Sequence, residues 1–490
     1  MLNFDFILNA DFDSNNAFCI NDINFTYSDF KKRIFLIAAN IQKKGLSKSK
    51  IAVYTKNHLD TYASFYAIWI TGNVYIPIHL SYPSVRVTEI ISQASVSMLI
   101  GTGENPFSDL EVEYLDTNSL SDNGNFEKDK IFRHRNEDLM YILFTSGSTG
   151  KPKGVQISFE NLSSFMGHVD AMKMDIKPGD RYLQMFELTF DLSVVSYVLP
   201  LQNGGTVFPV SDENVKYLEI YILLEDYKIN FAIIVPSVLA LLRPYFEDIN
   251  LPDLKTVALS GEAVPLKLTE DFQLCCPNAD FYNFYGPTEC TIFCTSFKIP
   301  RHNIPALNGI VYIGLPTKDC DGKIMTENLS EAALNEKAEL WLGGKQVSVG
   351  YVNNELLNKE SLLKIEERPY YKTGDLVMMK EDGLLYYLGR KDQQVKIQGY
   401  RIELMEVEHL CTQTLKSETA VVAVKDDRGF DQLVLFHKLQ NDLDIKERLL
   451  ENIPKYMVPS RIVALLDFPL NDNGKLDRKA LKTLIVNEKS

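Results

Sequence analysis

The stretch from Tyr141 to Val155, YILFTSGSTGKPKGV, constrains the fold more than any other part of the chain. The apolar run Met140 to Phe144 predicts a buried strand. Small hydroxylated residues, glycines and lysines follow it: Thr145, Ser146, Gly147, Ser148, Thr149, Gly150, Lys151 and Lys153. Glycines let a backbone approach its ligand closely, while hydroxyls, amide N–H groups and lysines attract anionic oxygens. The stretch therefore indicates a loop that binds a triphosphate where a buried strand ends.

This loop is not a Walker A loop. Only two residues separate Gly147 from Gly150, and Pro152 follows Lys151, so G-x-x-x-x-G-K-[ST] cannot be fitted. The alternative is a flexible Gly/Ser turn without a ligand. Such a turn would rarely combine hydroxyls and lysines this densely after a buried strand, so the phosphate-binding interpretation is favoured.

Strand and helix patterns alternate after the loop. We expect helices from near Ser158, from Asp191 and around 217–227, and strands at 182–186, 206–210, 231–235 and 256–259. This alternation predicts a parallel sheet covered by helices on both faces. Short strands and tight turns begin near Leu340, and a small α+β domain of about a hundred residues is expected after a boundary at Asp392.

Composition excludes several classes of protein. A chain of 490 residues is expected to form two or more domains, and a net charge of -14 argues against nucleic acid and anionic membranes as partners. The charge-free segment 61–85 contains Gly72 and two prolines, so a helix to about Ile70 and a strand at 74–78 explain it better than a membrane span. Seven cysteines without paired spacing, and no basic signal region, favour a cytoplasmic protein.

TSGSTGKPKG resembles the phosphate loop of the AMP-forming adenylating enzymes, which include acyl-CoA synthetases, luciferases and amino-acid adenylation domains. Other landmarks of that superfamily follow in order between about Phe25 and Leu481. The resemblance implies an α/β core, residues 1–391, of two β/α-layered subdomains and a small β-barrel-like subdomain. A small mobile α+β lid, residues 392–490, would turn about a hinge at Asp392. The chain is most similar to free-standing amino-acid adenylation enzymes.

The resemblance also implies how ATP and Mg²⁺ are bound. In NFYGPTE, Tyr285 would stack on adenine, Thr288 would contact the α-phosphate, and Glu289 would hold Mg²⁺. Asp375, with Arg390 as companion, would accept from the ribose hydroxyls, although TGDL read alone is a turn with a surface aspartate. The expected nucleotide contacts are Thr145, Ser146, Gly147, Ser148, Thr149, Gly150, Lys153, Gly261, Glu262, Ala263, Asn283, Phe284, Tyr285, Gly286, Thr288, Asp375, Arg390 and Lys475.

Asp191, in TFDLSVV, has two interpretations that the residues alone leave open: a helix N-cap, or a carboxylate that pairs with a substrate ammonium. The resemblance favours the second, because the aspartate of FDxSV binds the α-amino group in amino-acid adenylation domains. The substrate-binding residues would then be Lys475, which reaches the substrate carboxylate, and a pocket lined by Asp191, Leu192, Val195, Ile233, Ala258, Ser260, Phe284, Ile292 and Phe293. Its lack of other lining charge and its two phenylalanines predict a small neutral amino acid: alanine of either hand, proline, glycine, serine or valine.

Lys475, in NGKLDRKAL, would face solvent if read alone. The resemblance makes it the lysine that reaches the substrate carboxylate and the α-phosphate, so Lys475, Glu289 and Thr145 are the expected catalytic residues. Gly399, in KIQGYRIE, would let a pantetheine arm approach. Because the chain ends nine residues after Leu481, we expect a monomer that acts on a separate phosphopantetheinyl carrier protein.

Two other classes remain as alternatives. An acyl- or aryl-CoA synthetase would share the fold, but Asp191 argues against it. A non-catalytic nucleotide-binding relative is disfavoured by the joint presence of Glu289, Asp375 and Lys475. Departures from the family pattern at 338–340 and at Lys345-Gln346 are expected to lie away from the chemistry.

Overall fold

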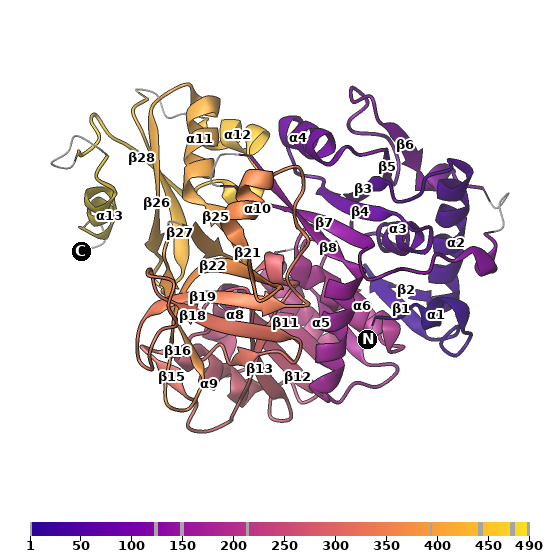
Figure 1. Ribbon diagram of the computed structural model, residues 1–490, viewed down its shortest axis with the longest axis horizontal. Coiled ribbons are helices and arrows are strands. Elements are labelled where there is room, and N and C mark those ends of the chain that lie inside the picture. The colour runs from indigo at the N-terminus through magenta and orange to yellow at the C-terminus, as the bar shows by residue number, and fades with distance from the viewer. Residues whose placement is uncertain are drawn as a thin grey trace. The chain divides into compact units, whose positions relative to one another are not determined.

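The computed structural model describes residues 2–121, 126–147, 151–211, 215–392, 394–439, 444–470 and 476–487. The chain divides into two compact units (Figure 1). The larger comprises Met1–Leu80, Ile91–Phe144 and Gly154–Lys391, and the smaller comprises Ser81–Ile90, Thr145–Lys153 and Asp392–Ser490. The phosphate loop therefore groups with the C-terminal part of the chain. The mobile lid and the hinge at Asp392 stay predictions.

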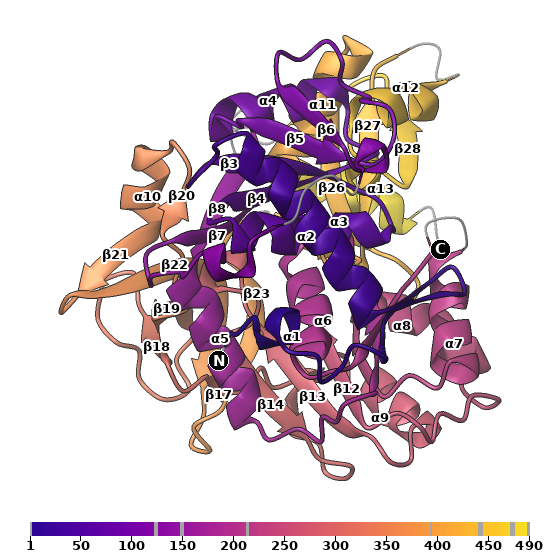
Figure 2. The same ribbon diagram turned by 90° about the vertical axis from the view of Figure 1, so that its right-hand side faces the viewer.

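One sheet of the larger unit has seven strands in the order β20-β8-β7-β4-β3-β5-β6. Its strands from β7 to β6 are parallel, and β20 runs antiparallel to β8. Figure 2 shows α2 and α3 alongside it. The bounds are β3 (Lys50–Thr55), β4 (Val74–His79), β5 (Met98–Gly101), β6 (Glu113–Asp116), β7 (Leu139–Thr145), β8 (Lys153–Ser158), β20 (Gly350–Tyr351), α2 (Tyr27–Lys43), α3 (Leu59–Ile70) and α4 (Ser84–Ala94).

The charge-free segment forms α3 and β4, as predicted. Every residue of α3 is buried, which explains why its composition imitates a membrane span. Gly72, with φ +73, makes the turn that ends the helix before β4 begins at Val74. Within the described residues, no helix is both long enough and apolar enough to cross a bilayer.

A second sheet of nine strands has the order β17-β14-β13-β12-β11-β9-β10-β1-β2. The strands from β13 to β1 are parallel and the edges are antiparallel. Its elements are β1 (Asn16–Ile20), β2 (Ile23–Thr26), β9 (Arg181–Gln184), β10 (Thr206–Pro209), β11 (Phe231–Ile234), β12 (Thr256–Ser260), β13 (Asp280–Tyr285), β14 (Thr295–Ile299), β17 (Leu315–Pro316), α1 (Asp5–Leu8), α5 (Phe159–Ala171), α6 (Asp191–Gln202), α7 (Lys216–Asp226), α8 (Pro236–Leu242) and α9 (Leu266–Cys275).

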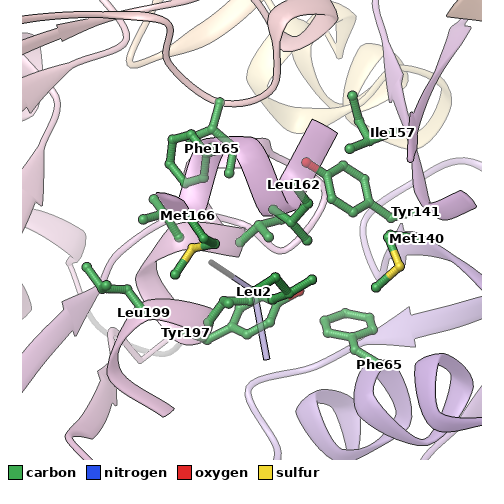
Figure 3. Packing of buried hydrophobic residues seen from close by; sticks show 14 of the residues in the cluster. Leu2, Phe65, Met140, Tyr141, Ile157, Leu162, Phe165, Met166, Tyr197 and Leu199 are labelled. Atoms are coloured by element: carbon green, nitrogen blue, oxygen red, sulfur yellow. The ribbon is translucent and has the colours of Figure 1, made fainter. Parts of the chain in front are cut away.

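The predicted helix after the phosphate loop is α5, and the structure explains its start and its buried face. Ser158 caps it by accepting from the N–H of Asn161, whose side chain accepts in return from the Ser158 N–H. Its apolar stripe enters the main core together with residues of β7 and α6 (Figure 3). The stripe is therefore core, as its helical spacing predicted.

A third sheet, in the order β18-β19-β22-β21 with β23 paired to β22, completes the larger unit. Over the described residues it is an open sheet rather than a closed barrel. The mixed α/β class is confirmed. The bounds are β15 (Ala306–Leu307), β16 (Ile310–Val311), β18 (Cys320–Met325), β19 (Ala338–Gly344), β21 (Leu362–Ile365), β22 (Arg368–Met379), β23 (Leu385–Arg390) and α10 (Glu355–Ser361).

The smaller unit contains a hairpin, a three-stranded sheet and a separate apolar core. The hairpin joins β24 (Gln394–Ile397) to β25 (Tyr400–Glu403), and the sheet has the order β26-β27-β28. Residues of β26, β27 and α13 form the core. The remaining bounds are β26 (Thr419–Lys425), β27 (Asp431–His437), β28 (Arg461–Ala464), α11 (Leu404–Leu415), α12 (Ile445–Asn452) and α13 (Arg478–Asn487).

Candidate active site

The phosphate loop follows β7, where the sequence placed it. Ser148, Thr149 and Gly150 lie outside the described residues. Gly147 must be glycine, since a Cβ there would lie 2.0 Å from the carbonyl oxygen of Lys151. The buried hydroxyl of Thr145 has no hydrogen-bond partner among the described residues. The Ser146 hydroxyl donates to the backbone oxygen of Arg401 at 2.7 Å.

A carboxylate already occupies one N–H group of this loop. The N–H of Gly147 donates to Oε2 of Glu406 at 2.8 Å, and Oε1 of Glu406 accepts from Nη1 of Arg86 at 3.1 Å. Arg86 also donates to the hydroxyl of Tyr456 at 3.3 Å. Burial raises the pKa of Glu406, while the Arg86 guanidinium and the Gly147 N–H act in the opposite direction. This N–H therefore faces an anionic oxygen in the structure.

Lys153, at the end of the loop, forms an ion pair. Its Nζ lies 3.5 Å from Oε1 of Glu403, at the end of β25, and both side chains are mostly buried. In the turn between β24 and β25, Gly399 has φ +82, a backbone conformation that favours glycine. The predicted pantetheine contact at Gly399 stays a prediction. Lys475 lies outside the described residues.

Asp375 is buried, and the surface-turn reading of TGDL is wrong. It lies within β22, opposite Arg390 of β23, and is 2% exposed. Its Oδ1 accepts from Nη1 of Arg390 at 2.9 Å, and its Oδ2 accepts from the hydroxyl of Tyr285 at 2.5 Å. Burial, and the adjacent Asp375 carboxylate, raise the pKa of Tyr285 well above its ordinary value. The structure thus brings the three predicted nucleotide residues into one hydrogen-bonded group.

Glu289 follows Thr288 in a 3-10 turn, Thr288–Cys290, and is buried. Its Oε1 accepts from the hydroxyl of Tyr351 at 2.6 Å, and its backbone oxygen accepts from the Ser348 N–H at 2.8 Å. No cluster of three or more His, Cys, Asp or Glu suited to a metal exists in the part of the chain that the structure describes. A single fixed carboxylate still fits Mg²⁺, because that ion takes most of its oxygens from phosphates and water.

Other predicted adenine-side residues make contacts inside the fold. Gly261 follows β12 with φ +89. The Glu262 carboxylate accepts from the N–H and hydroxyl of Ser237, both at 2.9 Å, in the first turn of α8. The Asn283 amide donates to the backbone oxygen of Tyr312 at 2.6 Å. These contacts fix backbone positions at the carboxyl ends of β12 and β13, and Ala263 lies in the same loop as Glu262.

Asp191 begins α6, but it is not the N-cap. Phe190 is the N-cap and makes no side-chain capping bond, so the capping interpretation of Asp191 is wrong. Asp191 is 9% exposed. Tyr141 of β7 lies close enough that the Asp191 charge helps to raise the pKa of its phenol, after burial and Tyr75. A mostly buried carboxylate therefore stands at the head of a buried helix.

Apart from Lys475, which lies outside the described residues, the predicted pocket-lining residues are all buried, and they come from α6, β11, β12, β13 and the loop after β13. The rings of Phe284 and Phe293 stack with centroids 4.0 Å apart and planes at 10°. Phe165 meets Phe293 edge to face at 4.8 Å. The hydroxyl of Ser260 donates to the backbone oxygen of Phe284 at 2.9 Å. Ile292, Leu192, Val195, Ile233 and Ala258 belong to the same buried apolar cluster as these three rings.

Sequence reasoning missed four residues that support these groups: Arg86, Glu406, Tyr351 and Gln346. Gln346 was expected to lie away from the chemistry, and that expectation stays a prediction. It is fully buried and bonds to the loop that carries Glu289, Ile292 and Phe293. No local pattern marks these four residues, because each acts through partners far away in the chain.

The fold is that of adenylating enzymes. Over 99% of this chain and 96% of the other, it matches the adenylation domain AlmE of Vibrio cholerae, solved with glycyl-adenosine-5'-phosphate, with a TM-score of 0.85 at 23% identity. It matches o-succinylbenzoate CoA synthetase from Bacillus subtilis over 99% of each chain, with a TM-score of 0.84 at 20% identity. The fold alone therefore does not separate the two activities.

The chain belongs to the AMP-binding enzyme family, whose model matches residues 10–352. The family predicted from the sequence motifs is thus confirmed. This chain is 32% identical, over 483 residues, to a D-alanine--D-alanyl carrier protein ligase of Bacillus cytotoxicus. The alignment covers 95% of each protein.

Proposed function

We propose that this enzyme activates a small neutral amino acid with ATP and transfers it to the phosphopantetheine thiol of a separate carrier protein. Membership of the AMP-binding enzyme family supports the first step. The relative named D-alanine--D-alanyl carrier protein ligase, similar over nearly its whole length, supports the second.

The observation that carries this proposal is the position of Asp191. Asp191 is 9% exposed at the head of α6, and the other residues predicted to line the side-chain pocket, Lys475 apart, carry no ionisable group. A mostly buried carboxylate attracts a cation strongly, because little water screens its charge. A substrate ammonium would pair with Asp191 in this way, whereas a fatty or aryl acid carries no cation to do so.

The aromatic contacts support a small side chain. Phe284 and Phe293 stack face to face, and Phe165 packs on Phe293 from another element. These rings occupy volume that a larger substrate would need. Alanine of either hand and glycine fit this reasoning best, followed by serine, valine and proline. An apolar pocket separates neighbours that differ by one methylene by only ~10–200-fold.

In the first step, a substrate carboxylate oxygen attacks the α-phosphorus of ATP and pyrophosphate leaves, which gives an aminoacyl adenylate. Asp375, held by Arg390 and Tyr285, would orient the ribose through its hydroxyls. The Gly147 N–H, which faces the Glu406 carboxylate in the structure, would donate to a phosphate oxygen instead. Glu289 and the triphosphate would hold Mg²⁺, which offsets phosphate charge. Lys475 would stabilise the charge that develops at the α-phosphorus.

In the second step, the pantetheine thiol loses its proton, and its sulfur attacks the acyl carbon of the adenylate. The acyl–phosphate bond breaks, and AMP leaves with the bonding electrons. Gly399 would let the arm approach, because it has no side chain to obstruct it.

Amino-acid-dependent exchange of labelled pyrophosphate into ATP tests the proposal. The panel contains D- and L-alanine, glycine, serine, valine, proline, lysine and phenylalanine, with propionate as the des-amino analogue of alanine. We expect exchange with the small neutral amino acids and none with propionate. Asp191→Ala should abolish the exchange, whereas Asp180→Ala, a buried aspartate paired with Lys255, should retain the same substrate preference. Exchange with propionate but not with alanine would instead favour a CoA synthetase.

A further inference from the structure

The loop between β13 and β14 contains a backbone turn that its residues disfavour. Thr291 has φ 56 and Ile292 has φ 71, both in the left-handed region. Both residues are β-branched, and a positive φ brings their Cβ groups against the backbone. The loop closes on itself, because the Cys294 N–H donates to the backbone oxygen of Tyr285 at 2.9 Å. Some other part of the structure must hold this turn in place.

Gln346, in the turn after β19, makes the bonds that hold it. Its Nε2 donates to the backbone oxygen of Phe293 at 2.9 Å, and lies 3.3 Å and 3.4 Å from those of Thr291 and Cys290. Its backbone oxygen accepts from the Thr291 hydroxyl at 2.7 Å. One side chain with no exposed surface therefore serves carbonyl groups on both sides of the turn.

Thr317 bonds to the other end of the Gln346 amide. The loop's carbonyl oxygens can only accept, so Nε2 faces them and Oε1 accepts from the Thr317 hydroxyl at 2.7 Å. The Thr317 N–H also donates to the backbone oxygen of Cys294 at 2.8 Å. Thr317 and Gln346 together thus bind the loop from Cys290 to Cys294.

We propose that Gln346 is a positioning residue for amino-acid selection, which acts by holding the Thr291–Ile292 turn so that Ile292 and Phe293 stay at the substrate. This inference rests on the proposed function. Glu289 precedes the turn and has its own supports in Tyr351 and Ser348. Loss of Gln346 should therefore disturb amino-acid binding far more than ATP binding.

The physical reason is the cost of unpaired carbonyls. Without the amide, buried backbone oxygens lose their hydrogen-bond donor. Thr291 and Ile292 then relieve their backbone strain by moving toward right-handed φ and ψ angles. Such a movement carries the Phe293 ring away from Phe284, whose stacking depends on the present geometry. The substrate space then widens, so larger side chains gain access and small ones lose their close contacts.

The test is Gln346→Met, which keeps the side chain's length and removes its polar atoms. In pyrophosphate exchange we expect the KM for alanine to rise about tenfold and the preference for alanine over leucine to fall about tenfold, corresponding to ~1.4 kcal/mol. The KM for ATP should change less than twofold. Thr317→Val should change the KM for alanine and the preference for alanine in the same direction, but less. Thr317→Ser, which keeps the hydroxyl, should give wild-type values of both.

Gln273→Met is the matched control. Gln273 is also a buried glutamine, and its amide donates to the backbone oxygen of Pro300 at 3.2 Å, away from this loop. We expect it to leave amino-acid preference unchanged. Equal effects of Gln346→Met and Gln273→Met on preference would mean that Gln346 is merely structural and would overturn the inference.

Amide hydrogen exchange of the peptide covering residues 288–295 separates this inference from the proposed function. It should quicken in Gln346→Met and in Thr317→Val, whichever substrate the enzyme uses. If no amino acid in the panel supports pyrophosphate exchange by the wild type, the proposed function fails. Hydrogen exchange of the 288–295 peptide then still shows whether Gln346 holds the loop. Should Gln346→Met not fold, Thr317→Val carries both measurements. If Thr317→Val changes neither the hydrogen exchange of this peptide nor the preference for alanine over leucine, the inference is refuted.

Discussion

Replacing Arg86 with methionine should destabilise the contact between Glu406 and the phosphate loop, and the loss should depend on pH. Arg86 donates to Glu406 and lies over the ring of Tyr82, with 5.2 Å from its guanidinium carbon to the ring centroid. Methionine preserves much of the packing of the side-chain stem but removes the cation. Glu406 would then be a fully buried carboxylate that retains one N–H donor, from Gly147. Such a group takes up a proton rather than staying charged.

The magnitude follows from the proton that Glu406 must bind. Its ordinary pKa is 4.5. Keeping it neutral at pH 7 costs ~3.4 kcal/mol, since each pH unit above 4.5 costs ~1.36 kcal/mol. At pH 5 the same cost is only ~0.7 kcal/mol. Above pH 4.5 the unfolded chain binds fewer protons than the folded variant, so the variant's stability falls as pH rises.

Native-state hydrogen exchange of α11, in increasing urea, measures this free energy for the unit that contains Glu406. Because the pKa of Glu406 is already raised in the wild type, Arg86→Met should lose at most ~3 kcal/mol relative to wild type at pH 7 and under ~1 kcal/mol at pH 5. Adding Glu406→Gln should recover most of the loss at pH 7. Arg478→Met is the control, because the side chain of its partner Glu408 is 16% exposed, against 1% for Glu406, and keeps the Val421 N–H as a donor. A loss that is equal at both pH values, or that Glu406→Gln does not relieve, would refute the reasoning.

Two further predictions concern the larger unit. Gly286→Ala should destabilise the protein by ~1–3 kcal/mol, because its Cβ would lie 2.4 Å from the Cα of Phe293. Gly167→Ala, inside α5 with no atom near the new Cβ, should be neutral or stabilise by up to ~1 kcal/mol, and urea unfolding of the two variants compares them directly. Burial lowers the pKa of His168 to about 4, so its stabilising contribution, at most ~3 kcal/mol, is complete above pH 6.5 and is lost as pH falls toward 4. His168→Gln should flatten the pH dependence of stability in that range, and an unchanged slope would contradict this assignment.

The predictable parts of the structure are those that short-range patterns determine. The buried strand before the phosphate loop, the helix capped by Ser158 and the charge-free helix and strand at 59–79 all appear where periodicity and turn residues placed them. Each depends on neighbours within a few positions along the chain. The same local reasoning failed at Asp375, because β22 continues through TGDL and its partner Arg390 arrives from the next strand.

Asp191 was ambiguous for a related reason. Strand-to-helix junctions favour aspartate as an N-cap, and nothing local separates a capping carboxylate from one that serves a ligand. The structure removes the first reading, because Phe190 occupies the N-cap and Asp191 begins the first turn. The distinction depends on a single residue of register, which lies below the accuracy of helix boundaries read from sequence.

The phosphate-loop motif predicts which N–H groups bind an anion, but it does not predict their partner within the fold. Its glycines and hydroxyls predict N–H groups suited to an anion, and in the structure the Gly147 N–H donates to a carboxylate, while the predicted phosphate contact stays a prediction. The anion is the carboxylate of Glu406, a residue that no motif near the loop indicates. Because one N–H cannot donate fully to both a carboxylate and a phosphate oxygen, the proposed binding of ATP at Gly147 would displace Glu406. Displacement leaves a buried glutamate with Arg86 as its remaining charged partner, so Arg86 should matter more to the enzyme with ATP bound than to the enzyme without it. The loss caused by Arg86→Met should therefore grow when ATP is added, which the same exchange measurement can detect.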